Sequence, residues 1–107
     1  MFAHKLCAMG ERLSPRDIYD VWFFLQNHTE INEEIVRIRT AKSVSEYAAW
    51  CAEHVKETSP KLLMQGLGEF LNDAKSKTFV KNKLIAETSS ALELFSAFPL
   101  IAKQIGR

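Results

Sequence analysis

Recurring helix-start signals are the feature that most constrains the fold of this chain. Ser14-Pro15 and Ser59-Pro60 each place a capping hydroxyl before a proline at the first helical position, where the missing proline N–H costs nothing. Ser43-Val44-Ser45-Glu46 fits the capping box, in which serine and glutamate satisfy each other's free backbone N–H groups. No Asn-Gly or Asp-Gly turn joins two alternating segments, so no β-hairpin is expected. These signals predict an all-α protein.

Apolar residues at helical spacing give the extent of each predicted helix. The stripes predict helices over residues 2–9 with a stop at Gly10, then 15–26, 32–39, 44–58, 60–71 and 78–98, with a final turn or two over 100–105. Gly66 and Gly68 are costly inside a helix and indicate a kink or a close helix contact. We therefore expect residues 1–107 to form a single helical domain, a compact bundle of five to seven helices with short connections.

Composition indicates where in the cell the chain is located but does not indicate which reaction it takes part in. With 107 residues and a net charge of +1, the chain is one domain without a global field that would attract a nucleic acid or a membrane. No run of about 18 apolar residues could span a bilayer. The first residues lack the basic flank and the long apolar stretch of a secretion signal. A cytoplasmic location is expected.

Cysteine and histidine give no sign of a metal site. Cys7 and Cys51 lack C-x-x-C spacing and sit in apolar helical patterns, so we interpret both as buried thiols. His4, His28 and His54 lack ligand spacing with the cysteines, and no zinc site is expected. The chain is predicted to bind no metal by itself.

The start of the second predicted helix carries an unusual set of charges. Asp17 and Asp20 are three residues apart, which puts their Cβ atoms roughly 5–6 Å from each other on one side of a helix. Arg16 lies four residues before Asp20 and could neutralise one carboxylate, and Lys5 and Arg12 lie just upstream. Spacing by itself favours a helix start with acidic residues stabilised by the macrodipole and one surface ion pair. The other interpretation is a charged functional site.

A family resemblance raises the weight of the second interpretation. The segment from Lys5 through Ala8 to Arg12, followed by Arg16-Asp17-Ile18-Tyr19-Asp20 and the apolar run Val21-Trp22-Phe23-Phe24-Leu25, resembles the closing motif of the AbiEii toxin family of nucleotidyltransferases. A looser similarity extends over residues 67–71 and 79–84. The resemblance implies that Lys5 contacts nucleotide phosphates and that Asp17 lies near the reacting hydroxyl or orders the site, with Arg12, Arg16 and Asp20 in support. The sequence leaves open whether Asp17 or Asp20 is the functional carboxylate, the alternative being that Asp20 is the structural partner of Arg12 or Arg16. Replacing Lys5 or Asp17 would then reduce activity while hardly changing thermal stability.

The chain lacks the N-terminal motif of the family, and this absence sets the expectations for activity, cofactor and partners. Such enzymes carry a Gly-Ser motif followed by metal-binding aspartates on an N-terminal sheet, and this chain has no Gly-Ser dipeptide. The resemblance therefore implies a C-terminal helical portion that is inactive without the N-terminal catalytic domain. Mg²⁺, a nucleoside triphosphate, tRNA and a cognate antitoxin are the cofactor and partners implied for the full enzyme. The alternative is a non-catalytic helical interaction module or a truncated remnant of the family.

Two surface features have open interpretations. Lys75, Lys77, Lys81 and Lys83 form a local basic cluster, which is either a solvated helix face or a contact to an RNA backbone. No aromatic platform interleaves these lysines. The run 21–25 is apolar all round, more than a one-sided helix requires, and Trp22, Phe23 and Phe24 are candidates for an exposed apolar surface. A homodimer is expected on this ground.

Overall fold

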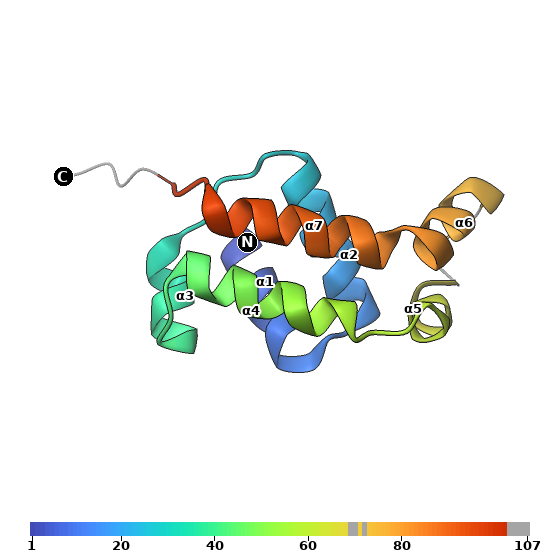
Figure 1. The fold of residues 1–107 in the computed structure, drawn as a ribbon, viewed down its shortest axis with the longest axis horizontal. Coiled ribbons are helices and arrows are strands. Elements are labelled where there is room, and N and C mark those ends of the chain that lie inside the picture. The colour runs from blue at the N-terminus through green and yellow to red at the C-terminus, as the bar shows by residue number, and fades with distance from the viewer. Residues whose placement is uncertain (69–70, 72, 103–107) are drawn as a thin grey trace.

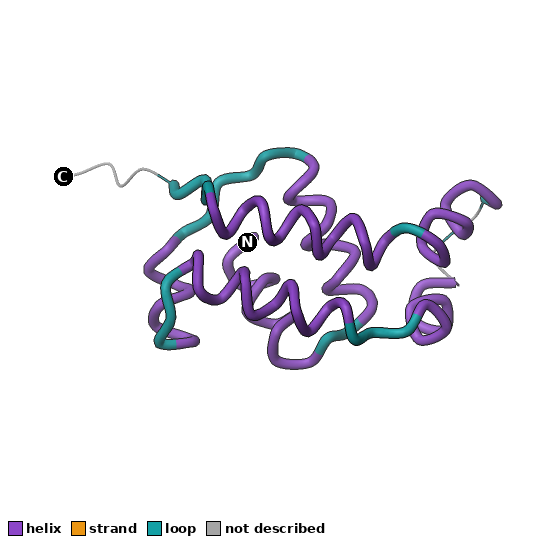
Figure 2. Tube along the Cα trace, viewed as in Figure 1, coloured by secondary structure: helices purple, strands orange, loops and turns teal. Residues whose placement is uncertain are grey.

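The fold is built from helices throughout the part of the chain that can be described. The computed structural model describes residues 1–68, 71 and 73–102. Its helices are α1 (Phe2–Arg12), α2 (Pro15–Gln26), α3 (Glu33–Thr40), α4 (Val44–Lys56), α5 (Pro60–Leu67), α6 (Ala74–Asn82) and α7 (Leu84–Ala97). Turns and short loops connect them, and these described residues contain no β-strand (Figure 2). The predicted all-α bundle of five to seven helices is confirmed.

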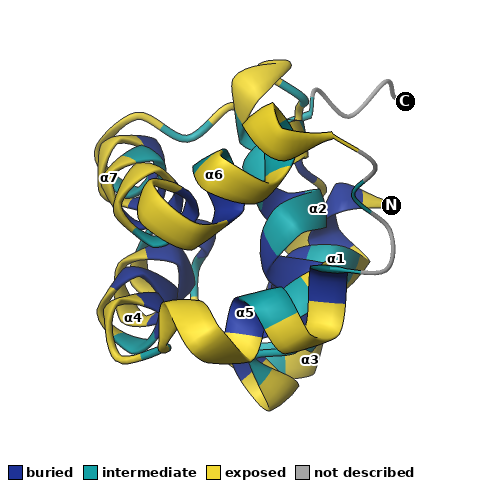
Figure 3. Cartoon of the chain, turned by 90° about the vertical axis from the view of Figure 1, so that its right-hand side faces the viewer, coloured by how far each residue is buried: buried dark blue, intermediate teal, exposed yellow. Residues whose placement is uncertain are grey.

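The helices pack in two layers around an elongated core. α4 and α7 lie side by side (Figure 1), and α7 also packs on α2. α1 contacts α2, α3 and α4, while α5 and α6 pack together at one end of the molecule. In the end-on view of Figure 3, the α4–α7 pair faces α1 and α2, with the buried sides of these helices turned inward. The principal extents are 48 × 23 × 20 Å.

The three predicted capping serines, Ser14, Ser43 and Ser59, all lie at the N-caps of helices. The capping box of Ser43 and Glu46 is formed in both directions at the start of α4. Ser59 accepts a hydrogen bond from the Leu62 N–H, and Asn32 accepts from two N–H groups of α3. Ser14 occupies the N-cap of α2 without a side-chain cap hydrogen bond, so that start relies on Pro15 and its fixed φ. Local sequence therefore determines where these helices begin.

The predicted stop at Gly10 is wrong, because α1 continues to Arg12 and ends at a left-handed Leu13. Gly10 is buried in the helix, where a Cβ atom would collide with the Tyr47 hydroxyl and come within 3.1 Å of the Trp50 ring. The glycine thus permits α1 and α4 to approach closely. Its role comes from packing between helices, which a helix-ending signal read along one segment does not reveal.

The predicted continuous helix over residues 78–98 is also wrong. α6 begins earlier, at Ala74, where Asp73 caps it by accepting from the Ser76 N–H, and α7 begins at Leu84. The backbone leaves helical geometry at Lys83, with φ −129° and ψ −23°. This break allows α6 to turn onto α5 while α7 stays packed on α4 and α2.

The two glycines of the α5 region have different environments. A Cβ atom on Gly66 would lie 2.6 Å from the Pro15 ring, so the predicted close helix contact is confirmed there. Gly68, the C-cap of α5, has open space around it. The helix expected over 60–71 ends at Leu67, and the part of that expectation at residues 69–70 lies outside the described residues.

The C-terminal segment is extended at the point where a further helical turn was expected. The Ile31 N–H donates to the Leu100 carbonyl, and the Ala102 N–H donates to the Ile31 carbonyl, each over 2.8 Å. These bonds form an isolated parallel bridge between Ile31 and Ile101. The rest of that expectation, residues 103–105, lies outside the described residues.

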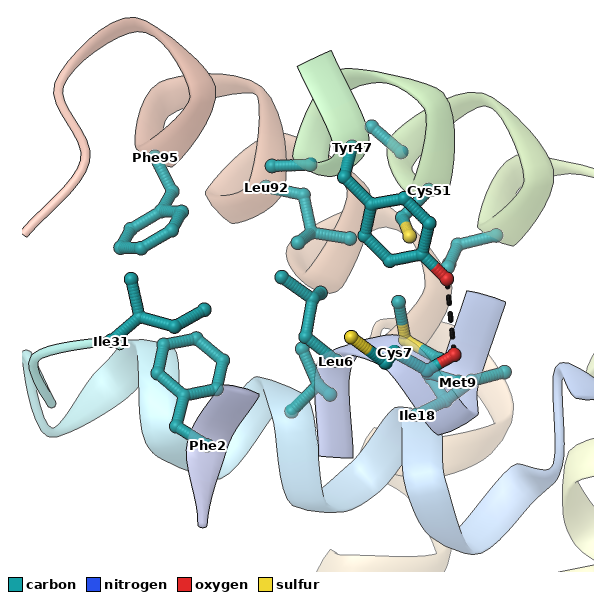
Figure 4. Close-up of a cluster of buried hydrophobic side chains, with 14 of the residues drawn as sticks. Phe2, Leu6, Cys7, Met9, Ile18, Ile31, Tyr47, Cys51, Leu92 and Phe95 are labelled. Atoms are coloured by element: carbon teal, nitrogen blue, oxygen red, sulfur yellow. Dashed lines mark hydrogen bonds between the residues drawn. The ribbon is translucent and has the colours of Figure 1, made fainter. Parts of the chain in front are cut away.

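The core is apolar and contains both cysteines (Figure 4). The expectation that Cys7 and Cys51 are buried free thiols is confirmed. Burial raises the pKa of both thiols, which keeps them protonated at neutral pH. The Tyr47 hydroxyl donates to the Cys7 carbonyl over 3.0 Å, a buried hydrogen bond that joins α4 to α1. Within the described residues, no helix is long and apolar enough to cross a membrane.

Candidate functional site

The tight connection between α1 and α2 gathers the charged residues of the sequence motif. α1 ends at Arg12, and Ser14 and Pro15 already begin α2, so the two helices pack directly on each other. Lys5 lies on the side of α1 that meets α2, while Asp17 and Asp20 occupy the first turns of α2. The fold thus places four of the five predicted site residues in one ion-pair cluster.

Two cations and two carboxylates are paired in this cluster, which we call the Lys5–Asp17 cluster and which consists of Lys5, Arg12, Asp17 and Asp20. Lys5 Nζ lies 3.3 Å from Asp17 Oδ1 and 2.9 Å from Asp20 Oδ2. Arg12 Nη2 donates to Asp17 Oδ2 over 2.7 Å. Lys5 therefore bridges the two carboxylates, and Asp17 uses one oxygen for each cation. The formal charges of the cluster cancel.

Burial differs sharply among the members of the cluster. The Asp17 side chain is 5% exposed, whereas the Lys5 side chain is 31% exposed and Arg12 lies largely in solvent. The hydrogen bond to Asp20 raises the pKa of Lys5, and this outweighs the lowering that burial causes. Lys5 therefore remains protonated at neutral pH, and part of its side chain is accessible to an anion.

The burial of Asp17 changes the expectation for its replacement. The expectation that its loss would hardly change thermal stability assumes a surface residue, and that assumption is wrong. Asp17 sits in the first turn of α2, where the helix dipole also favours a negative charge. Its two ion pairs fasten α1 to α2, so Asp17 has a structural role whatever its part in chemistry.

Arg16 lies beside the cluster at the edge of a small hollow. This hollow of about 190 Å³ is lined by Arg16, Tyr19, Asp20, Leu67 and Leu71. Sequence reasoning did not include Tyr19, Leu67 or Leu71 in the site. Tyr19 could be found from its position next to Asp20, but the two leucines come from a region about 50 residues later, and no local signal links them to α2.

The cluster does not suit a magnesium ion. Mg²⁺ requires near-octahedral oxygen ligands, and both Asp17 oxygens already face cations. No group of three or more His, Cys, Asp or Glu side chains within the described residues is arranged to hold a metal. His54 packs against Trp50, with ring centroids 3.9 Å apart and the rings tilted by 34°, and does not belong to the cluster.

The predicted basic cluster is distant from the Lys5–Asp17 cluster in sequence and lies on another element. Lys75, Lys77 and Lys81 are exposed on α6, and Lys83 is exposed at its C-cap. α6 packs against α5 and α7 at one end of the molecule (Figure 1). The fold therefore keeps the two candidate sites on separate elements.

Comparison of the sequence with known protein families gives a match. The model of a family described as nucleotidyl transferase AbiEii toxin, type IV TA system, matches residues 1–97. This range includes every helix from α1 to α7 and all members of the Lys5–Asp17 cluster. Searches of curated proteins and of solved structures gave no match.

Proposed function

The chain belongs to the AbiEii nucleotidyl transferase toxin family of type IV toxin–antitoxin systems, and from that premise we propose that it forms the helical part of a nucleotidyltransferase. In this role the Lys5–Asp17 cluster borders the cleft that holds the nucleotide and the RNA. The observation that carries the proposal is the pairing of Lys5 with both Asp17 and Asp20 within a motif that the family resemblance singled out.

The chemistry of nucleotidyl transfer suits the properties of these side chains. Such reactions depend mainly on positioning and on neutralising the charge of the phosphates. Lys5 is cationic and partly accessible, which suits it to contact a phosphate as a point charge. Asp17 is held by two cations and serves to orient Lys5 and Arg12. Arg16 and Asp20 support this arrangement from the edge of the adjacent hollow.

The remaining parts of the proposed enzyme lie outside this chain. A catalytic sheet domain would supply the carboxylates that hold Mg²⁺, because the described residues do not fit that ion. The substrates are a nucleoside triphosphate and tRNA, and the toxin acts in the cytoplasm beside a cognate antitoxin. The type IV toxin–antitoxin description of the family supports the antitoxin.

The purified 107-residue chain is expected to be inactive on its own. With labelled nucleoside triphosphates, tRNA and Mg²⁺, we expect no transfer above the level of a reaction without protein, because the carboxylates for the metal are missing. Filter binding or gel analysis of labelled tRNA measures this. Robust transfer that disappears in the Asp17→Asn variant would show that the chain holds a complete site and would refute the proposed role.

The alternative function is a helical interaction module that has kept the fold without the chemistry. The neutral charge of the Lys5–Asp17 cluster is the observation that favours it, because the ion pairs already join α1 to α2. The DNA upstream of codon 1 discriminates between the two functions. An in-frame Gly-Ser motif followed by aspartates would support the enzyme, and its absence would support the module.

Self-association is expected through the apolar surface of the chain, which includes Phe23 and the end of α7. Phe23 is 55% exposed, whereas Phe24 stacks on Phe2 and Trp22 packs against Phe79. A further apolar hollow of about 430 Å³ lies between the ends of α2 and α7, and its lining includes the exposed side chains of Leu94 and Phe98. Exposed apolar patches of this kind mark protein contacts.

In sedimentation velocity at increasing concentration, we expect the chain to form a dimer, and we expect Phe98→Asp to weaken it. Ile38→Asp is the matched control, since Ile38 is equally exposed on α3. A strict monomer at high micromolar concentration would contradict the expected association. Equal weakening by both substitutions would contradict its assignment to the α7 end.

A further inference from the structure

α6 carries a group of lysines whose charge no ion pair within the described residues compensates. The helix Ala74–Asn82 contains three lysines and no Asp or Glu, and Lys83 follows at its C-cap. None of these lysines forms an ion pair within the described residues. By contrast, the cations of α1, α3 and α4 are neutralised by carboxylates in the pairs Lys5–Asp17, Arg12–Asp17, Arg37–Glu33, Arg39–Glu11 and Lys56–Glu93.

The lysines surround the exposed side of α6. Val80 is buried and Phe79 is half-buried against Trp22, so these residues hold the helix on the domain. Lys77 and Lys81 are one helical turn apart, a like-charge pair that is unfavourable for an isolated helix. An anionic partner would remove this repulsion.

Two hollows flank the helix, and each is lined by at least one of these lysines. Lys75, Thr78, Phe79 and Lys83 line a hollow of about 310 Å³ together with Ala74. Lys81 lines another of about 400 Å³ with Asn82 and residues of α4, α5 and α7. Ammonium groups and a hydroxyl are suitable donors for phosphate oxygens. Since the donors occupy both flanks, they suit a chain of phosphates better than one small anion.

We propose that α6 binds the sugar-phosphate backbone of an RNA, with Lys75 and Lys83 on one flank and Lys81 on the other. The choice of RNA over other polyanions rests on the proposed function, in which the acceptor is an RNA. The contact reads no sequence, because it is made to phosphates and not to base edges. It includes no base stacking, because Phe79 packs against Trp22 with ring centroids 4.7 Å apart and α6 has no other aromatic side chain. α6 lies on a different element from the Lys5–Asp17 cluster, so it anchors the RNA without taking part in transfer.

Binding of fluorescent tRNA to the full 107-residue chain, measured by anisotropy at several salt concentrations, tests this. The double variant Lys75→Gln/Lys83→Gln is expected to bind on the order of tenfold more weakly, and its slope of log K against log salt should fall by about two. The matched control is Arg37→Gln/Lys42→Gln, which removes the same charge at the α3–α4 end, far from α6 (Figure 1). All four positions are exposed, and circular dichroism verifies the fold of each variant.

The outcomes separate the proposed contact from its alternatives. Loss of affinity and slope in the α6 variant with a near-normal control supports the proposal. Equal losses in both variants, unchanged affinity in the α6 variant, or preferential binding of duplex DNA would overturn it. Competition by polyglutamate as effective as that by unlabelled tRNA would point to an acidic protein partner and would also overturn it. Because no transfer is measured, failure here leaves the proposed function standing. Full transfer by a Lys5→Ala toxin would remove Lys5 from the proposed site and leave this contact standing.

Discussion

Replacing Lys5 with alanine in a toxin that contains this helical region and its catalytic domain is expected to lower nucleotidyl transfer by about a hundredfold or more. Loss of a group that stabilises charge in a transition state has an effect of this order. Lys5 is a partly accessible cation that bridges both carboxylates of its cluster, and its hydrogen bond to Asp20 raises its pKa. Initial rates of tRNA labelling measure the loss, and Lys42→Ala is the control, an exposed lysine without a carboxylate partner in the described chain.

Thermal denaturation of the same variants separates a role in transfer from a role in folding. In Lys5→Ala, Asp17 keeps Arg12 and Asp20 is partly in solvent, so unfolding free energy should fall by only about 1 kcal/mol. In Asp17→Ala, a buried carboxylate with two partners is lost. We expect the unfolding free energy to fall by about 1–3 kcal/mol and transfer to be reduced. Full transfer in Lys5→Ala would remove Lys5 from the site. Full transfer in Asp17→Ala with only a lower melting temperature would assign Asp17 to the helix.

Replacing Gly10 with alanine is expected to destabilise the fold, although alanine is the better helix former. Higher helix propensity would contribute about 1 kcal/mol in favour of alanine. The added methyl group would collide with Tyr47, and overpacking of a core costs about 1–3 kcal/mol. Displacing Tyr47 also breaks its hydrogen bond to the Cys7 carbonyl, which increases the loss of stability by about 1 kcal/mol. The net loss of about 1–3 kcal/mol should lower the melting temperature by roughly 5–20 °C.

A double-mutant cycle with Tyr47→Phe identifies the cause of the Gly10 effect. Removing the hydroxyl removes the nearest atom that the methyl group would meet, so Gly10→Ala should cost less in the Tyr47→Phe background than in the native chain. Gly68→Ala is the control, because Gly68 has right-handed helical angles and open space around it. It should be neutral or slightly stabilising. Additive effects of Gly10→Ala and Tyr47→Phe, or a stabilised Gly10→Ala, would contradict this explanation.

The family, and the members of the Lys5–Asp17 cluster, could be predicted from residues 5–25. The order of lysine, arginine and aspartate there resembled the AbiEii motif, and the family match over residues 1–97 confirms that prediction. What could not be predicted is which cation meets which carboxylate. Arg16 is near Asp20 in sequence, yet Asp20 pairs with Lys5 of the preceding helix, fifteen residues earlier. That pairing depends on how α1 lies on α2, and helical spacing along one segment contains no such information.

The sequence by itself determined the helical class and most helix starts, because a capping hydrogen bond joins residues only two or three positions apart. The tertiary structure decided where α1 ends, where the C-terminal helix breaks and how deeply Asp17 is buried. Gly10 lies inside α1, where its missing Cβ leaves room for Tyr47, 37 residues later in the chain. Lys83 interrupts a helical pattern because α6 packs on α5 and α7 packs on α4. These features come from contacts between segments far apart in the chain, which local propensities cannot specify.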